Sequence, residues 1–233
     1  MDDTLLREIP QPLQDAVAQI QSQSGIQIIV RPTTPDLLRE FPILAQLPLL
    51  DIWPEEERIC IWYPNETLSL PDLCHELIHA RRNILESVPR MSPRSEAQHP
   101  ELIYALENDL EHLFVIPEEI SYFLSQGAKW EERYSIYLAQ AAPNAFNLFR
   151  HWIVINTAMP TSRRIRDLCR TALQESNLLD DAESFRTEIE AAFPDKEQLL
   201  AVVLRWFPKV KRDVCMQRYV TSNRTLQVIS SVS

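Results

Sequence analysis

Apolar side chains recur at helical and at strand spacing in the first third of the chain. Leu13, Val17 and Ile20 fall on one face of a helix, which ends before Gly25. Two short runs that are rich in β-branched and aromatic residues follow, and both are typical of strands. The second run ends at Pro64. The predicted elements are a helix from about Pro12 to Ser22, strands at 26–30 and 59–64, and an irregular or partly helical stretch at 32–50.

Two longer helices are expected in the middle of the chain. Ser69 near the N-cap, with Pro71 at or next to the first helical position, predicts a helix over 71–87. A proline-containing loop follows. A second helix starts at Pro100 and stops before Pro117, because proline lacks the amide hydrogen that a helix interior needs.

Every long segment after residue 128 has helical periodicity. Aromatic side chains recur there at helical spacing, which is typical of the core of a helical bundle. The last dozen residues are expected to form a frayed tail. The sequence therefore predicts one domain at 1–128 and a helical region at 129–233 packed on it. The expected helices span 129–142, 144–156, 161–176, 181–192 and 195–217.

Composition and charge are those of an ordinary globular protein. The 233 residues are 45% apolar and 24% charged, with a formal net charge of −10. The negative total argues against a protein whose main role is to coat nucleic acid, because the phosphate backbone demands a cationic surface. Two basic clusters could contact DNA or an acidic partner, but we interpret them as solvated helix faces. They comprise Arg163, Arg164, Arg166 and Arg170, and Lys209, Lys211, Arg212 and Arg218.

The amino terminus does not resemble a signal peptide. MDDTLLREIPQPLQDAV begins with two acids and has no apolar core, and no apolar run of about 18 residues occurs elsewhere. We therefore expect a cytoplasmic protein that does not enter a membrane. The cysteines form no CxxC pair, so buried free thiols are expected rather than a zinc ribbon. They are Cys60, Cys74, Cys169 and Cys215.

The segment HELIH carries the candidate chemistry. His75 and His79 stand four residues apart on the predicted helix, so both imidazoles project from one face and can bind one tetrahedral metal ion. Glu76 lies beside the first histidine, where its carboxylate can reach a metal-bound water. Zinc lowers the pKa of its water and polarises a carbonyl, while a glutamate accepts and returns the proton. HELIH therefore predicts a zinc hydrolase with Glu76 as the general base.

A catalytic zinc needs a third protein ligand, which the residues just after His79 do not supply. Glu107 lies in an apolar stripe of the second helix, where a carboxylate is costly unless it meets a cation. We expect Glu107 to be that ligand, with Glu111, Glu101 or His112 as its replacement. Glu111, one turn on, could accept a hydrogen bond from a metal-binding histidine as a second-shell carboxylate.

A hydrolase also needs a donor that stabilises the oxyanion of the transition state. Four side chains are candidates, and the sequence does not choose among them. His112 lies off the Glu107 stripe and is interpreted as a surface or substrate-side histidine rather than a ligand. The candidates are His112, Tyr104, Tyr122 and His99.

Two segments together resemble a known family. ICIWYPNETLSLPDLCHELIHARR and ALENDLEHLFVIPEEISYF resemble the ImmA/IrrE-like zincin metallopeptidases over about residues 10 to 125. The resemblance implies an α+β zincin-like fold, helix-rich with a small amino-terminal sheet, extended here by helices. It maps the family's glutamate ligand to Glu107, and the proline that ends the hydrophobic run after that glutamate to Pro117. Bulkier, charged residues at Asp109, Glu111 and His112 depart from the family's small-residue pattern.

The resemblance also implies a function. Members commonly cleave a transcriptional repressor at one site, so a zinc peptidase acting on a specific intracellular protein is expected. Two other hypotheses stay open. One is a non-catalytic zincin-fold binding or sensor module that recruits a partner through its helical half. The other is an iron site with two histidines and one carboxylate, which these ligand types permit.

Overall fold

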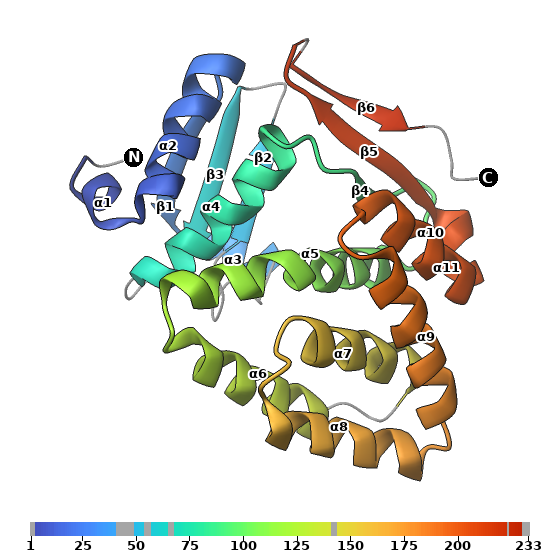
Figure 1. The fold of residues 1–233 in the computed structure, drawn as a ribbon. Coiled ribbons are helices and arrows are strands. Elements are labelled where there is room, and N and C mark those ends of the chain that lie inside the picture. Colours follow the sequence, from blue (N-terminus) through green and yellow to red (C-terminus); the bar gives the residue numbers. More distant parts are fainter. Residues whose placement is uncertain are drawn as a thin grey trace. The chain divides into compact units, whose positions relative to one another are not determined.

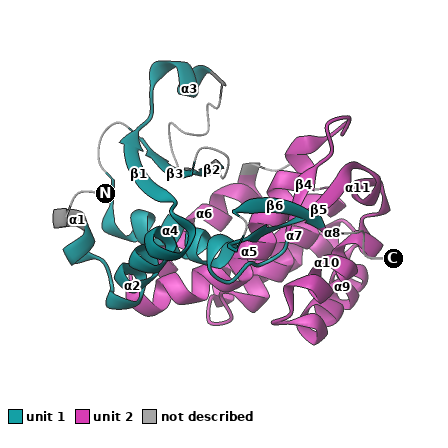
Figure 2. Cartoon of the chain, turned by 90° about the horizontal axis from the view of Figure 1, so that it is seen from above, with its two compact units in different colours: residues 1–89, 217–228 teal, residues 90–216, 229–233 magenta. Residues whose placement is uncertain are grey.

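The chain folds into two compact units in the computed structural model (Figure 2). Unit 1 comprises residues 1–89 and 217–228, and unit 2 comprises residues 90–216 and 229–233. The predicted boundary between residues 128 and 129 falls inside unit 2. The chain mixes helices, at about 65%, with small sheets, so the α+β class is confirmed. The structure describes residues 3–40, 49–53, 57–64, 68–140, 144–222 and 224–229.

Unit 1 combines a three-stranded sheet with helices (Figure 1). The strand order is β1-β3-β2, with β1 parallel and β2 antiparallel to β3. Strands β1 and β3 confirm the two predicted strands, and β2 is a further strand that the sequence analysis missed. The elements are α1 (Asp3–Glu8), α2 (Gln11–Gln19), the single π-turn η1 (Ile20–Ser24), β1 (Gln27–Pro32), α3 (Pro35–Glu40), β2 (Leu49–Trp53), β3 (Arg58–Tyr63) and α4 (Leu70–Ile84).

Helix α4 is positioned by apolar packing inside unit 1. It packs against α2 and against β2 and β3 (Figure 1). The predicted face of the first helix, Leu13, Val17 and Ile20, is buried, and the π-turn ends at Gly25 with a positive φ of 73°. Burying these side chains stabilises the unit because apolar surface leaves water.

Unit 2 is built around the long helix α5, whose extent corrects one prediction. α5 does not stop before Pro117 but continues through it to Tyr122. Pro117 cannot donate a backbone hydrogen bond, but tertiary contacts on both sides of it stabilise the continued helix. Ile116 is fully buried, and the Glu119 carboxylate accepts a hydrogen bond from Trp130 Nε1 at 2.9 Å. The elements are β4 (Arg90–Pro93), α5 (Pro100–Tyr122), α6 (Gln126–Gln140), α7 (Ala145–Thr157), α8 (Arg163–Glu175), α9 (Leu179–Ala192), α10 (Lys196–Trp206) and α11 (Pro208–Asp213).

The carboxy-terminal stretch differs most from its prediction. One helix over 195–217 is wrong: α10 ends before Phe207, α11 begins at Pro208, and strand β5 (Val214–Val220) follows. A frayed tail is wrong for strand β6 (Thr225–Ile229), whereas residues 223 and 230–233 of that prediction lie outside the described residues. β4, β5 and β6 form a second sheet in that order, and the division between the units falls within β5. Within unit 1, Thr221 Oγ1 donates to the carbonyl oxygen of Ile84 at 2.9 Å. β5 pairs with β6, which follows it closely along the chain, and with β4, which lies far earlier in the sequence.

A polar cluster lies in the core of unit 2. Asp109 of α5 and Arg150 of α7 form an ion pair with an Oδ2–Nε distance of 2.8 Å. Beside it, the buried His151 ring stacks on Tyr137 and meets Tyr134 edge-on, with centroids 5.8 and 5.5 Å apart. His151 Nδ1 has no hydrogen-bond partner among the described residues. Burial, helped by the Arg150 charge, lowers the pKa of His151 to about 4, whereas burial raises the pKa of Asp109 to about 6.

His151 is expected to make the free energy of unfolding fall in acid. Its pKa is about 4 in the folded chain against an ordinary 6.5, so the unfolded chain binds the proton first. This contribution is complete above pH 6.5 and is lost as the pH falls toward 4. Relative to His151→Phe, which keeps a ring against Tyr137, the wild type should lose about 2 kcal/mol between about pH 7 and pH 5.

Urea unfolding of both proteins at the two pH values measures this effect. Asp109 acts in the opposite direction, because a carboxyl with a raised pKa gains relative stability in acid. It is present in both proteins and cancels in the difference. A difference in unfolding free energy that stays constant with pH would show that the His151 pKa is not lowered.

Candidate metal centre

The local sequence sets the start of the helix that carries HELIH. Ser69 caps α4, its Oγ accepting a hydrogen bond from the amide of Asp72 at 3.3 Å, and proline occupies the first turn. The apolar side chains Leu73 and Leu77 are buried and hold the helix in unit 1. His75, Glu76 and His79 are therefore carried on a capped, packed helix, as predicted for this segment.

The two histidines of α4 meet at their ring nitrogens. His75 Nε2 and His79 Nε2 lie 3.2 Å apart, and the ring centroids are 4.8 Å apart at an interplanar angle of 73°. Two nitrogens bound to one tetrahedral zinc, each at 2.0–2.1 Å, lie about 3.3 Å apart. Both imidazoles are buried. The pair thus fits two of the ligand positions of a zinc ion.

Glu76 is the buried carboxylate of the same helix turn. Its side chain is adjacent in sequence to His75, and the residue is 6% exposed. At the end of the helix, Arg81 Nε lies 2.8 Å and Arg82 Nη1 3.6 Å from carboxylate oxygens of Glu86. The side chain of Arg82 is buried as well. A buried carboxylate on the helix that carries both histidines suits proton transfer at a metal ion held there.

Within unit 2, the predicted ligand Glu107 already has a cation. Lys196 Nζ of α10 lies 3.0 Å from Glu107 Oε1 and 2.6 Å from Glu111 Oε1. The second oxygen of Glu107 accepts a hydrogen bond from the backbone amide of Met91 at 2.9 Å. The cation that a carboxylate in this apolar stripe requires is therefore present, and Lys196 supplies it. Metal binding by Glu107 stays a prediction.

Burial and charge act against each other in this triad. Burial raises the pKa of Glu107, with a further rise from Glu111, although Lys196 acts to lower it. Burial alone would lower the pKa of Lys196, but the two carboxylates outweigh it and raise that pKa above its ordinary value. Lys196 thus carries a full positive charge, and only 4% of its side chain is exposed.

Lys196 was not predicted from the sequence, because no pattern in the neighbouring residues indicates that it is buried between two acids. It is the first residue of α10, after the N-cap Asp195, whose Oδ1 accepts from the amides of Glu197 and Gln198 at 2.9 and 3.1 Å. A lysine at a helix N-terminus opposes the helix dipole and is normally solvated. Only the packing of α10 in unit 2 shows that it is buried between two acids.

The candidate oxyanion donors differ in their surroundings. His112 is buried, its ring edge-on to Trp130 with centroids 5.0 Å apart. Tyr104 is 59% exposed, and His99 is exposed with Nδ1 3.3 Å from Glu101 Oε1. The hydroxyl of Tyr122 donates to Glu118 Oε1 at 3.0 Å. None of these contacts tests the predicted role in catalysis.

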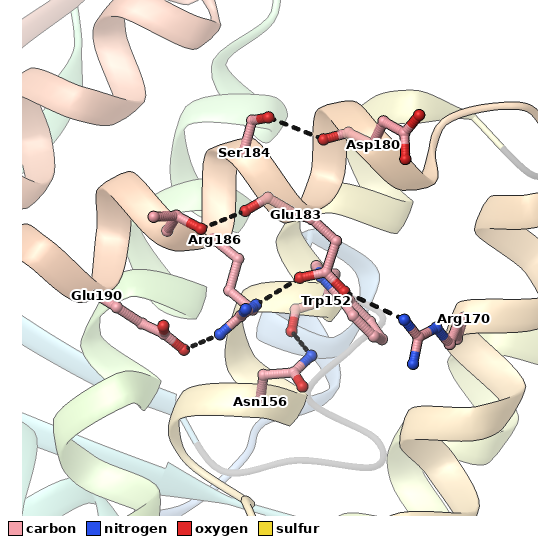
Figure 3. Close-up of polar contacts among 9 residues, drawn as sticks. Trp152, Asn156, Arg170, Asp180, Glu183, Ser184, Arg186 and Glu190 are labelled. Atoms are coloured by element: carbon pink, nitrogen blue, oxygen red, sulfur yellow. Dashed lines mark hydrogen bonds and ion pairs between the residues drawn. The ribbon is translucent and has the colours of Figure 1, made fainter.

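The basic cluster of α8 is partly neutralised by α9 (Figure 3). Arg170 Nη2 lies 3.8 Å from Glu183 Oε1, and the other carboxylate oxygen of Glu183 accepts from Arg186 Nε at 2.8 Å. Arg163 and Arg164 at the start of α8 are exposed. Their interpretation as a solvated face, without direct nucleic-acid binding, stays a prediction.

Comparison with known proteins does not identify a family or a related protein for this chain. No family model, curated protein or solved structure matches this chain. The resemblance to the ImmA/IrrE-like family therefore stays a prediction that rests on HELIH and the α5 segment. Among the described helices, none has both the length and the apolarity needed to cross a bilayer.

Proposed function

We propose that this chain is a zinc-dependent metallopeptidase of the HExxH type, with a zincin-like catalytic part and a helical extension. The 3.2 Å separation of His75 Nε2 and His79 Nε2 carries the proposal, because it matches two ligands of one tetrahedral zinc. His75 and His79 hold the ion, and helix α5 supplies the third ligand. Glu107 is the ligand that the family resemblance implies.

The chain's own residues then have defined roles. Zinc, when bound, supplies a Lewis acid and lowers the pKa of a coordinated water. Glu76 holds the proton that water loses and returns it to the leaving amine, which requires a carboxylate and not an amide. Glu111 accepts a hydrogen bond from His75 or His79 and so fixes the tautomer of that imidazole. Oxyanion stabilisation is assigned to a donor among His112, Tyr104 and Tyr122.

The proposed substrate is a protein inside the cytoplasm. This assignment comes from the resemblance, whose members commonly cleave a transcriptional repressor at one site. A narrow protein substrate predicts cleavage of one or a few bonds rather than general digestion of unfolded protein.

Zinc binding is the first expected result. Elemental analysis of the full chain should find about one zinc ion, because structural and catalytic zinc sites of this kind hold a single ion. His79→Ala should lose it, since one imidazole cannot replace the pair. His99→Ala is the matched control: His99 is exposed in unit 2 and should leave the zinc content unchanged.

A wild-type chain that takes up no zinc after zinc is added would overturn the proposal. Retention of a full equivalent in His79→Ala would overturn the ligand assignment. Iron in place of zinc would favour the iron site that the ligand types also permit.

A further inference from the structure

Helix α8 begins at Arg163 without the contacts that normally satisfy a helix start. Its N-cap residue is Ser162, but the Ser162 hydroxyl accepts no hydrogen bond from a backbone amide of the helix. Within the part of the chain that the structure describes, the amides of Arg164 and Ile165 have no hydrogen-bond acceptor. The start of α8 therefore presents free backbone donors at the positive end of the helix dipole.

Two side chains at the same helix start also have free donors. Ser162 is 6% exposed, and its Oγ has no hydrogen-bond partner among the described residues. Arg166 folds back over the preceding turn, where its Nη2 donates to the carbonyl oxygen of Pro160. Its Nε is buried and has no partner in the described ranges. Because a buried donor without an acceptor is costly, both side chains favour a bound acceptor at this position.

Positive charge gathers around these donors. Arg163 and Arg164 are exposed, and neither forms an ion pair with a residue that the structure describes. Cations at a helix N-terminus oppose the helix dipole, so they destabilise the helix unless an anion lies beside them. The first turn of α8 contains no acidic residue, and the first acid of the helix is Asp167. Further along, Arg170 is matched by Glu183 at 3.8 Å (Figure 3).

We propose that the N-terminal end of α8 binds a phosphate group, either inorganic phosphate or a phosphate monoester. Helix N-terminal amides and guanidinium groups are the donors that bind phosphate oxygens in proteins, and a serine hydroxyl adds a further hydrogen bond. A phosphate monoester has three acceptor oxygens and up to two negative charges, so it can satisfy more of these donors than a carboxylate can. The site lies within unit 2 and does not depend on the proposed zinc chemistry. Its side-chain contacts are Ser162, Arg163, Arg164 and Arg166.

Isothermal titration calorimetry of the full chain with inorganic phosphate, in chloride buffer, tests the site. About one phosphate per chain should bind, because one helix start supplies the donors. Arg163→Gln combined with Arg166→Gln should weaken binding by about 10-fold or more, since charge-assisted hydrogen bonds are lost. Arg170→Gln is the matched control: it removes the same charge from the same helix beyond the first turn, and should change the affinity by less than about twofold. Equal weakening in both proteins would overturn the inference, because it would show attraction to the overall charge alone.

Nuclear magnetic resonance of the wild-type chain tests the site without a variant. Added phosphate should shift the amide resonances of Arg164 and Ile165, whose hydrogens are free in the described structure, and should leave that of Arg170 in place. Unshifted Arg164 and Ile165 amides at saturating phosphate would overturn the inference.

The identity of the ligand and the independence from zinc need two further titrations. Phenyl phosphate distinguishes the sources: tighter binding than that of inorganic phosphate identifies a monoester site, and weaker binding identifies a site for free phosphate. A duplex oligonucleotide that binds where neither small ligand does would overturn the inference in favour of a nucleic-acid surface. Phosphate can also bind to a zinc ion, so His79→Ala should bind phosphate as the wild type does. Loss of phosphate binding in that variant would overturn the site at α8, whereas the zinc content tests the proposed function separately.

Discussion

Peptide hydrolysis should fall by about 10²–10⁴-fold in Glu76→Gln, while the chain keeps its zinc. Glutamine has the size and hydrogen-bonding geometry of glutamate but does not accept a proton at neutral pH. Glu76 is buried and follows His75 directly in helix α4. The measurement pairs the zinc content with cleavage rates of peptides that the wild type cuts, selected from a peptide library by mass spectrometry.

Glu86→Gln is the matched control for this prediction. Glu86 follows the same helix, is 41% exposed in its side chain, and pairs with Arg81 and Arg82 at the opposite end from the cap. Its replacement should leave the rate within a factor of about two, as expected of a surface substitution. Undiminished hydrolysis in Glu76→Gln would refute the general-base role. A zinc-loaded wild type that cuts nothing would instead favour the non-catalytic binding or sensor module.

Loss of the ammonium in Lys196→Met should lower the free energy of unfolding by about 3–5 kcal/mol. Methionine fills a similar volume but leaves Glu107 and Glu111 buried beside each other without their shared cation. Because burial already raises the pKa of Glu107, protonation can relieve part of this repulsion, and the deficit should shrink as the pH falls. Urea unfolding near neutral pH and in mild acid measures both effects.

A triple variant separates the effect of charge from that of packing. Lys196→Met combined with Glu107→Gln and Glu111→Gln removes the whole charge cluster and should recover a large part of the lost stability. Lys209→Met is the control, because Lys209 is exposed on α11 and should change stability by less than about 0.5 kcal/mol. A loss below about 1 kcal/mol in Lys196→Met would show that the triad does not hold α10 to α5.

Local signals predicted the helix that carries the candidate chemistry. The cap at Ser69 and proline in the first turn are short-range features, and they place α4 within one to three residues of its expected ends. The spacing of His75 and His79 follows from helix geometry alone, and the rings meet as that geometry requires. The predicted strands β1 and β3 were recognised for a similar reason, since their side chains favour a pleated, buried surface.

Tertiary contacts explain why helix α5 extends past Pro117 and why strands β2 and β5 form, features that were not predicted from the sequence. The α5 helix runs through Pro117 because buried side chains after the proline, including Glu119 bound to Trp130, compensate for the missing amide. β2 forms by pairing with β3, and β5 follows directly after the short helix α11, within a segment predicted to be one helix. Whether such a segment forms a strand depends on the packing of its side chains in the folded chain, which strand propensity alone does not show.

The sequence by itself determined the identity and spacing of His75, Glu76 and His79 and the helix that presents them, because helical periodicity and capping act over a few residues. Only the tertiary structure decided what surrounds the acids of α5. Lys196 lies 89 residues beyond Glu107 along the chain, and the two meet at 3.0 Å because α10 packs near α5 in unit 2. Burial, which turns a surface lysine into the partner of two carboxylates, is a property of packed elements and not of any short segment.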